Sequence, residues 1–187
     1  MYQIAWSVTR LLFRTLVPIT YHGAENVQRD APYILICNHN SMFDPLAIAG
    51  RCYRYQVRFL GKKELTKNPI TKWLFKNLLM IPVDRHHSDL SALRECLKAL
   101  GGGHVLGIFP EGTRYKQGVM EDMESGVAMI ALRAKATLIP AYITGKPRLF
   151  RRVHVTYGQP ISTLALAKKG VSKETCAELM ETITETY

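Results

Sequence analysis

Short apolar runs alternate with helix-like segments along most of this chain, and this alternation is the strongest constraint on its fold. Repeated strand–helix order is typical of a single α/β domain, with a largely parallel central sheet flanked by helices. We expect the last strands to join as an antiparallel edge, and Ser88 to be the N-cap of one helix. The sequence predicts strands at 33–38, 57–61, 80–83, 105–109, 138–143 and 153–157, and helices at 45–51, 68–79, 88–100, 125–135 and 172–185.

The first 20 residues form a separate feature. Their apolar side chains recur at helical spacing, while Arg10 and Arg14 interrupt the run and rule out a membrane-spanning helix. The pattern is typical of an amphipathic helix on a membrane surface, and the alternative is a helix packed on the protein's own core. We therefore divide the chain into a membrane-associating helix at 1–20 and a functional domain at 21–187, a length that suits one full core.

Charge narrows the class of partner. The chain has 25 Lys and Arg against 15 Asp and Glu, a net charge of +10. This excess favours an anionic partner: a nucleic acid, an anionic lipid or a phosphorylated substrate. No nucleic-acid-binding motif is recognised. The four cysteines form no CxxC and the six histidines lack metal-ligand spacing, so we expect reduced cysteines, no metal and no cofactor.

Polar side chains follow four of the predicted strands, at the point where each strand ends. Ligands of α/β proteins bind outside the carboxyl ends of the strands, so these groups are expected to share one edge of the sheet. A purely structural reason explains each of them alone but explains the set poorly. In chain order they are Asn38-His39, Lys62-Lys63, Asp84-Arg85 and the segment FPEGTR at 109–114.

The stretch NHNSMFDP at 38–45 predicts a histidine–carboxylate pair. We expect Asp44 to be a helix N-cap followed by Pro45 at the first helical position, the competing assignment being a capping box from Ser41 to Asp44. The turn then brings His39 back to Asp44, whose carboxylate fixes the tautomer and leaves the other ring nitrogen as a general base. Ser41 lacks a GxSxG elbow, so we expect it to hydrogen-bond within the turn and not to be a nucleophile.

FPEGTR predicts the second half of the site. Gly112 permits a tight turn or a close backbone approach, and Arg114 can bind a phosphate with two parallel hydrogen bonds. Arg85 and one of the two lysines can join it. Glu111 can orient these cations or bind a substrate hydroxyl, although an ion pair between Glu111 and Arg114 is the plain alternative.

These residues resemble a known family. NHNSMFD matches the NHxSxxD pattern of the glycerolipid acyltransferases that include bacterial 1-acyl-sn-glycerol-3-phosphate acyltransferase, and FPEGTR matches their second signature block. The segments FLGKKEL, MIPVDR and LIPAYI look like further blocks of that family. The matches occur in family order between residues 38 and 143.

The resemblance implies acyl transfer from acyl-CoA or acyl-acyl carrier protein to the sn-2 hydroxyl of 1-acylglycerol 3-phosphate (lysophosphatidic acid), giving phosphatidic acid in phospholipid biosynthesis. His39 would be the general base and Asp44 its orienting carboxylate. Backbone N–H groups of the NHNS turn or of the Gly112 region would bind the tetrahedral oxyanion. The implied substrate-binding residues are Lys62, Lys63, Arg85, Glu111, Gly112, Thr113 and Arg114.

A basic apolar stretch, KNPITKWLFKNLLM at 67–80, adds a second membrane-binding candidate to the segment at 1–20. We therefore expect peripheral attachment to the cytoplasmic face of the cell membrane, on an anionic lipid surface. Two alternatives remain open. One is the same chemistry on glycerol 3-phosphate or another lysolipid, and the other is a non-catalytic basic module that binds membrane or nucleic acid.

Overall fold

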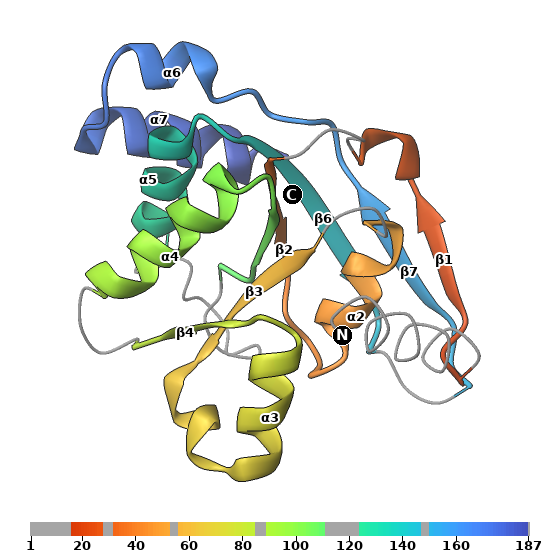
Figure 1. Cartoon of the computed structure of the whole chain (residues 1–187). Helices are drawn as coiled ribbons and strands as arrows, with labels where there is room; N and C mark the ends of the chain where they lie inside the picture. Colours follow the sequence, from red (N-terminus) through yellow and green to blue (C-terminus); the bar gives the residue numbers. More distant parts are fainter. Residues whose placement is uncertain are drawn as a thin grey trace.

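A seven-stranded sheet runs through the computed structural model of the chain, which describes residues 16–27, 32–52, 56–84, 89–110, 124–146 and 150–186 (Figure 1). The strands are β1 (Ile19–His22), β2 (Tyr33–Cys37), β3 (Val57–Lys62), β4 (Ile81–Val83), β5 (Val105–Ile108), β6 (Thr137–Thr144) and β7 (Val153–Tyr157). The helices are α2 (Asp44–Ile48), α3 (Pro69–Asn77), α4 (Leu90–Gly101), α5 (Glu124–Ala134), α6 (Leu164–Lys168) and α7 (Lys173–Thr184), with 3-10 turns η1 (Ala24–Asn26), η2 (Ala49–Arg51) and η3 (Lys63–Lys67).

The sheet has the strand order β1-β7-β6-β2-β5-β3-β4. Every neighbouring pair is parallel except β6 and β7, which confirms the predicted α/β fold with a largely parallel sheet. The antiparallel pair is as expected, but it is not the edge, because β1 pairs in parallel with β7 outside it. The strand β1 was not predicted, and position 20, the expected boundary of the N-terminal helix, lies within it.

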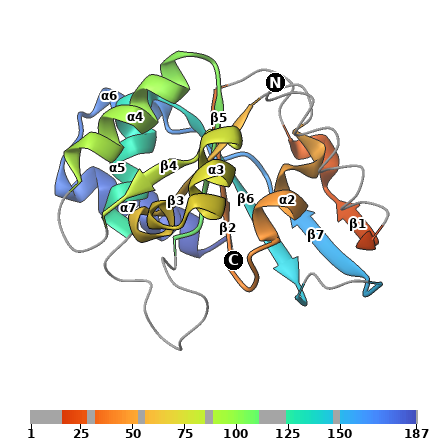
Figure 2. The same cartoon turned by 60° about the horizontal axis from the view of Figure 1, so that its bottom comes forward.

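Helices lie on both faces of the sheet (Figures 1 and 2), and a hydrophobic cluster is buried on each face. The helices α4, α5 and α7 pack on one face, which we call the far face, and α2 packs on the other, which we call the near face. The central strands β2 and β5 are buried along their whole length, as expected for parallel strands covered on both sides. The strand β7 alternates buried and exposed residues and is therefore covered on its near face alone.

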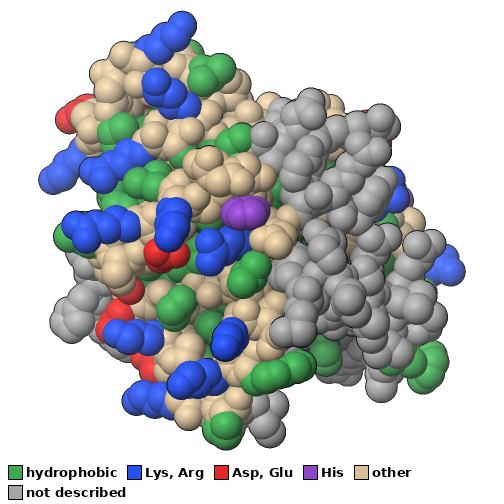
Figure 3. All heavy atoms as spheres, viewed as in Figure 1, with side chains coloured by type: hydrophobic (Ala, Val, Ile, Leu, Met, Phe, Trp, Pro, Cys, Tyr) green, Lys and Arg blue, Asp and Glu red, His purple; other side chains and the backbone are tan. Residues whose placement is uncertain are grey.

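The helix α3 connects β3 to β4 and lies at the periphery of the molecule in Figure 1. Trp73 is 64% exposed on it, and Lys72 and Lys76 are exposed beside it. Figure 3 shows Lys and Arg side chains interleaved with hydrophobic ones over this part of the molecule. Phe75 differs from the expected membrane-facing set, because it is buried against Gly61 and Met80.

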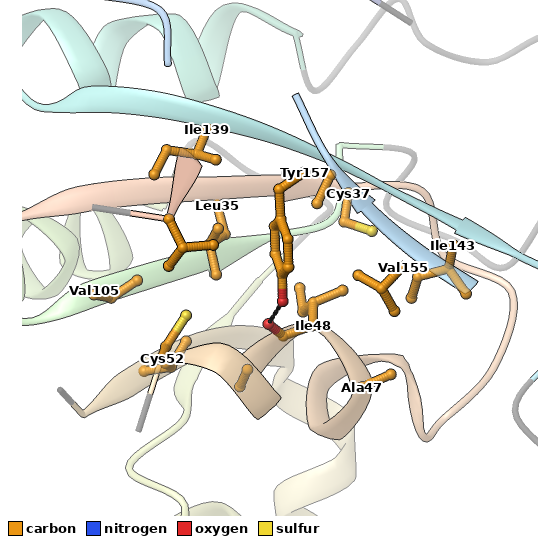
Figure 4. Close-up of a cluster of buried hydrophobic side chains, with 14 of the residues drawn as sticks. Leu35, Cys37, Ala47, Ile48, Cys52, Val105, Ile139, Ile143, Val155 and Tyr157 are labelled. Carbon is orange, nitrogen blue, oxygen red and sulfur yellow. Dashed lines mark hydrogen bonds between the residues drawn. The ribbon is translucent and has the colours of Figure 1, made fainter. Parts of the chain in front are cut away.

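The near face carries polar contacts inside its apolar cluster (Figure 4). The Tyr157 hydroxyl donates a 2.6 Å hydrogen bond to the carbonyl of Ile48, the last residue of α2. Burial raises the pKa of the Tyr157 hydroxyl well above its ordinary value, so it stays protonated as the donor. A second tyrosine, Tyr21 of β1, donates to the carbonyl of Ala47 at 3.0 Å.

Three of the four cysteines are buried, and the N-cap of one helix lies one residue later than expected. Cys37, Cys52 and Cys96 are free thiols buried in the core, and burial raises the pKa of Cys96 to about 12. The N-cap of α4 is Asp89, whose carboxylate accepts from two backbone N–H groups, so the assignment to Ser88 was wrong. The expected helix at 1–20 falls mainly on residues outside the described ranges.

Candidate active site

The site lies where the central strands end. The strands β2 and β5 pair in register at Ile36 and Ile108, so the segments that follow them leave the sheet side by side. His39 follows β2 and Phe109 follows β5. The carboxyl ends of β3 and β4 lie at the same edge, because Lys62 pairs with Val83 in a parallel ladder. The shared edge predicted from the sequence is therefore present.

His39 and Asp44 form the expected pair. The Nδ1 atom of His39 lies 2.9 Å from Oδ2 of Asp44. The Asp44 side chain is fully buried, whereas the His39 side chain is 18% exposed. A buried carboxylate at this distance fixes the imidazole tautomer with the proton on Nδ1 and stabilises the ring when it gains a second proton.

Asp44 does not cap its own helix. Its Oδ2 atom accepts 2.6 Å hydrogen bonds from the backbone N–H groups of Asn40 and Ser41, which precede α2. The N-cap position is occupied by Phe43, which makes no side-chain cap, so the prediction of an Asp44 cap was wrong. The carboxylate instead closes the turn back on itself, and the short, charge-assisted bonds hold the turn rigidly around His39.

Ser41 and Asn38 complete the turn. The Ser41 hydroxyl accepts from the backbone N–H of Phe43 at 3.3 Å, which confirms its role within the turn. Asn38 extends the sheet by one pair: its Oδ1 accepts from Ile143 N at 2.7 Å and its Nδ2 donates to Ile143 O at 3.0 Å. The end of β2 is thereby fixed to β6 directly before His39.

The arrangement leaves one ring nitrogen of His39 available. Among the described residues, Nε2 of His39 has no hydrogen-bond partner, and the ring is open to solvent on part of its surface. A neutral imidazole held at Nδ1 presents a lone pair at Nε2, which can accept a proton from a bound hydroxyl. Within the part of the chain that the structure describes, Asp44 Oδ1 is buried without a hydrogen-bond partner, so this carboxylate keeps an unsatisfied acceptor beside the pair.

The two predicted lysines lie at the end of β3. Lys62 and Lys63 are exposed, and the Nζ atom of Lys63 lies 3.9 Å from a carboxylate oxygen of Asp84. The β5 strand lies between β2 and β3, so one strand separates β3, which ends at Lys62, from β2, which precedes His39. Both lysines therefore lie at the carboxyl edge of the sheet, two strand positions from β2.

The remaining predicted residues, namely Arg85, Glu111, Gly112, Thr113 and Arg114, lie outside the described ranges. Two residues of the sequence motifs had no predicted role. Asn38, in the NHxSxxD block, fastens β2 to β6, and Phe109, the first residue of FPEGTR, stacks on the His39 imidazole. Their positions in the motifs were the signal, but their contacts depend on how β5 and β6 flank β2.

Comparisons with known proteins identify the family of this chain. The acyltransferase family model matches residues 18–144. The chain is 28% identical to the 1-acyl-sn-glycerol-3-phosphate acyltransferase of Bacillus subtilis, covering 99% of this chain and 94% of that protein. It is 30% identical to the Streptococcus pneumoniae protein of the same name, covering 79% of this chain and 57% of that protein.

A solved structure shares the fold. The crystal structure of the 1-acyl-sn-glycerophosphate (LPA) acyltransferase PlsC from Thermotoga maritima superposes with a TM-score of 0.71 at 25% identity, over 97% of this chain and 76% of that one. The family match spans β1 to the end of β6 and includes the whole His39–Asp44 turn. From this agreement of motif, geometry and fold, the chain belongs to the acyltransferase family.

Proposed function

We propose that this protein transfers an acyl chain from a thioester donor to the sn-2 hydroxyl of 1-acylglycerol 3-phosphate, forming phosphatidic acid. Its likeness to the Bacillus subtilis enzyme over nearly the full length of both chains supports this activity. The observation that carries the chemistry is the His39–Asp44 pair, held at 2.9 Å with Nε2 available at the carboxyl edge of the sheet.

The reaction runs in two steps and needs no covalent acyl-enzyme. In the first, Nε2 of His39 takes the proton of the acceptor hydroxyl as its oxygen bonds to the thioester carbonyl carbon. In the second, the carbonyl re-forms, the carbon–sulfur bond breaks and the imidazolium returns the proton to the leaving thiolate. Asp44 stabilises the imidazolium between the two steps.

The oxyanion formed between these steps needs hydrogen-bond donors. Two candidate donors in the turn, the N–H groups of Asn40 and Ser41, are already bound to Asp44 Oδ2. The Phe43 N–H is bound to Ser41. Because these three N–H groups already have acceptors, we assign the oxyanion donors to the Gly112 region.

We assign the acceptor phosphate to Arg85, Arg114 and the lysines at the end of β3, with Glu111, Gly112 and Thr113 shaping its surroundings. The exposed lysines at the shared edge support this assignment. Arg114→Ala should then raise the KM for lysophosphatidic acid more than the KM for the acyl donor. An effect confined to the donor would overturn the assignment.

Peripheral attachment to the anionic cytoplasmic face of the membrane is the localisation we propose. Within the described residues, no helix has the length and apolar character needed to cross a membrane. A surface formed by η3 and α3, which we call the α3 surface, combines exposed apolar groups with cations; it consists of Leu65 and Lys67 of η3 and Lys72, Trp73 and Lys76 of α3. Each lysine near an anionic surface contributes about 1 kcal/mol, and the segment at 1–20 would add a second contact.

Sedimentation with anionic and neutral vesicles tests this surface. Trp73→Ala and the pair Lys72→Gln and Lys76→Gln should weaken binding, the lysine pair more strongly at low salt. Lys173→Gln, an exposed lysine on α7, is the matched control. Unchanged vesicle binding in all α3 variants would remove α3 from the membrane contact.

The activity is tested by thiol release and product analysis. The purified protein is given acyl-CoA or acyl-acyl carrier protein, with lysophosphatidic acid, another lysolipid or glycerol 3-phosphate as acceptor. We expect release that depends on lysophosphatidic acid and disappears in His39→Ala. His104→Ala, which changes a histidine at the opposite end of β5, should retain it. Release that survives the loss of His39 would disprove this mechanism.

A further inference from the structure

The imidazole of His39 is stacked on the ring of Phe109, which has no part in the mechanism above. The ring centroids of His39 and Phe109 are 4.3 Å apart, and their planes are inclined by 25°. Phe109 is 8% exposed, so its ring is a nearly buried platform. The hydrogen bond to Asp44 fixes one atom of the imidazole, and a stack of this kind fixes the plane in which the remaining atoms lie.

A second phenylalanine, Phe59, packs against Phe109. Phe59 of β3 stacks on it with centroids 5.9 Å apart and planes inclined by 15°, and Phe59 is 4% exposed. In the ladder between β3 and β5, Phe59 lies opposite Gly107. A side chain on Gly107 would collide with the Phe59 ring, so the glycine leaves the space that this ring fills.

The sheet geometry explains why the three rings are aligned. Gly107 and Phe109 are two residues apart, and side chains at this spacing point to the same face of an extended strand. The space left by Gly107 is therefore directly beside Phe109. Phe59 enters that space from the neighbouring strand and stacks on Phe109, and Phe109 contacts the imidazole.

We propose that Phe109 is a positioning residue for the general base, which rests on the role of His39 proposed above. Its ring, supported by Phe59 in the gap at Gly107, sets the imidazole plane so that Nε2 is directed at the acceptor hydroxyl. Its π face also stabilises the imidazolium, the charged form that exists only after the proton has moved. The contact is therefore stronger along the reaction than in the resting enzyme, which raises kcat and leaves KM unaltered.

The rate test replaces the ring in two ways. Phe109→Leu removes the π face and should lower kcat about tenfold, with the KM of donor and acceptor unchanged. Replacement of Phe109 by mono-, di- and trifluorinated phenylalanine keeps the ring shape and withdraws charge from its face. These variants should lower kcat stepwise, and they keep the test decisive if Phe109→Leu does not fold.

Phe75→Leu is the matched control. Phe75 is 7% exposed and packs over Gly61 much as Phe59 packs over Gly107, but it belongs to α3 and does not stack on His39. It should lose stability as Phe109→Leu does and retain kcat. An equal loss of kcat in Phe75→Leu, or a constant kcat across the fluorinated series, would overturn the proposal.

A second readout needs no turnover. The carbon-bound ring protons of His39, assigned by their absence in His39→Ala, should show a ring-current shift that disappears in Phe109→Leu and persists in Phe75→Leu. Absence of the shift in the native protein would refute the stack itself. A native protein without acyl transfer would instead refute the proposed function, so the two failures are distinguishable.

Discussion

The two faces of the central sheet hold their helices in different ways. On the far face, α4, α5 and α7 have 12, 11 and 12 residues and bury apolar side chains along their length. On the near face, α2 has five residues and buries Ala47 and Ile48 with Asp44. A helix this short gains too little from its own hydrogen bonds and packing to be stable alone.

Directional hydrogen bonds replace that missing packing. At the end of α2, Tyr157 and Tyr21 donate to the carbonyls of Ile48 and Ala47. At its start, Asp44 accepts from the turn that carries His39. Both faces therefore bury a large apolar cluster, but on the near face hydrogen bonds also fix the position of the few atoms on which His39 depends. Changes on the two faces should therefore affect different measurements.

The largest effect should follow from Asp44→Asn. The amide oxygen can still accept from the turn, and the amide nitrogen replaces Oδ1, which has no partner among the residues described, so the shape of the site is retained. The neutral side chain no longer stabilises the imidazolium, and kcat should fall by about 10²–10⁴-fold. Steady-state kinetics and thermal unfolding of the same samples measure the two effects together.

If Asp44→Asn retains near-normal kcat while its melting temperature falls, then the carboxylate is a structural clamp on the turn and has no role in the chemistry. His39→Gln provides the reference for a site without a base. Turnover in Asp44→Asn should approach that of His39→Gln.

On the far face, Leu100→Ala should show the reverse behaviour. Leu100 of α4 is 1% exposed in the far-face cluster, and truncation of a buried leucine destabilises the folded state by about 2–5 kcal/mol. Denaturant unfolding should show this loss. The kcat measured well below the melting temperature should be unchanged, and a large fall in kcat would break the distinction between the faces.

The sequence predicted the long elements of this fold because each has a strong local signal. The buried strands β2 and β5 are continuous apolar runs, and α4 and α7 have helical periodicity. The strand β1 has four residues, half-buried at the edge, with neither signal, so it was missed. Short edge strands take their structure from their neighbour, in this case β7.

The site was predictable in its residues and less so in its contacts. His39 and Asp44 were paired correctly because a strand–turn–helix motif brings them together. The direction of the Asp44 carboxylate was predicted wrongly, because aspartate before proline is typical of a helix N-cap. In the structure the carboxylate accepts hydrogen bonds from the backbone N–H groups of the preceding turn instead. The Phe109 stack depends on strand order, which local patterns do not specify.

The hydroxyl of Tyr157 holds the end of α2. Tyr157→Phe removes one hydroxyl and leaves the buried Ile48 carbonyl without its donor, which should destabilise the protein by about 1–3 kcal/mol. Because α2 carries Asp44, kcat should also fall several-fold, unlike in Leu100→Ala. Tyr142→Phe, at a tyrosine that is 49% exposed, is the control and should change neither quantity. A loss of stability with an unchanged kcat would show that the tyrosine does not position Asp44.

The smallest effect should come from Asp89, where the far face also uses a hydrogen-bonded polar group. The pKa of Asp89 is lowered from 3.8 to about 2, chiefly by the backbone N–H of Asp84, with further bonds from Ser91 and Ala92. Because the folded pKa lies below the unfolded one, the ionised cap stabilises the folded state above pH 3.8 and loses this contribution as the pH falls towards 2. Asp89→Ala should therefore destabilise the protein by about 0.5–2 kcal/mol at neutral pH, with a difference that shrinks over that acid range.

The matched variant Asp89→Asn keeps a cap without a charge, so its stability relative to Asp89→Ala should not depend on pH. Unfolding followed by circular dichroism at several pH values provides both comparisons. Neither variant should alter kcat, since α4 packs on the far face, whereas the near-face helix α2 carries Asp44. Hydrogen bonds hold helices on both faces, so the presence of such a bond would not predict an effect on kcat. The effect on kcat would depend on whether the bonded group belongs to α2, the helix that carries Asp44.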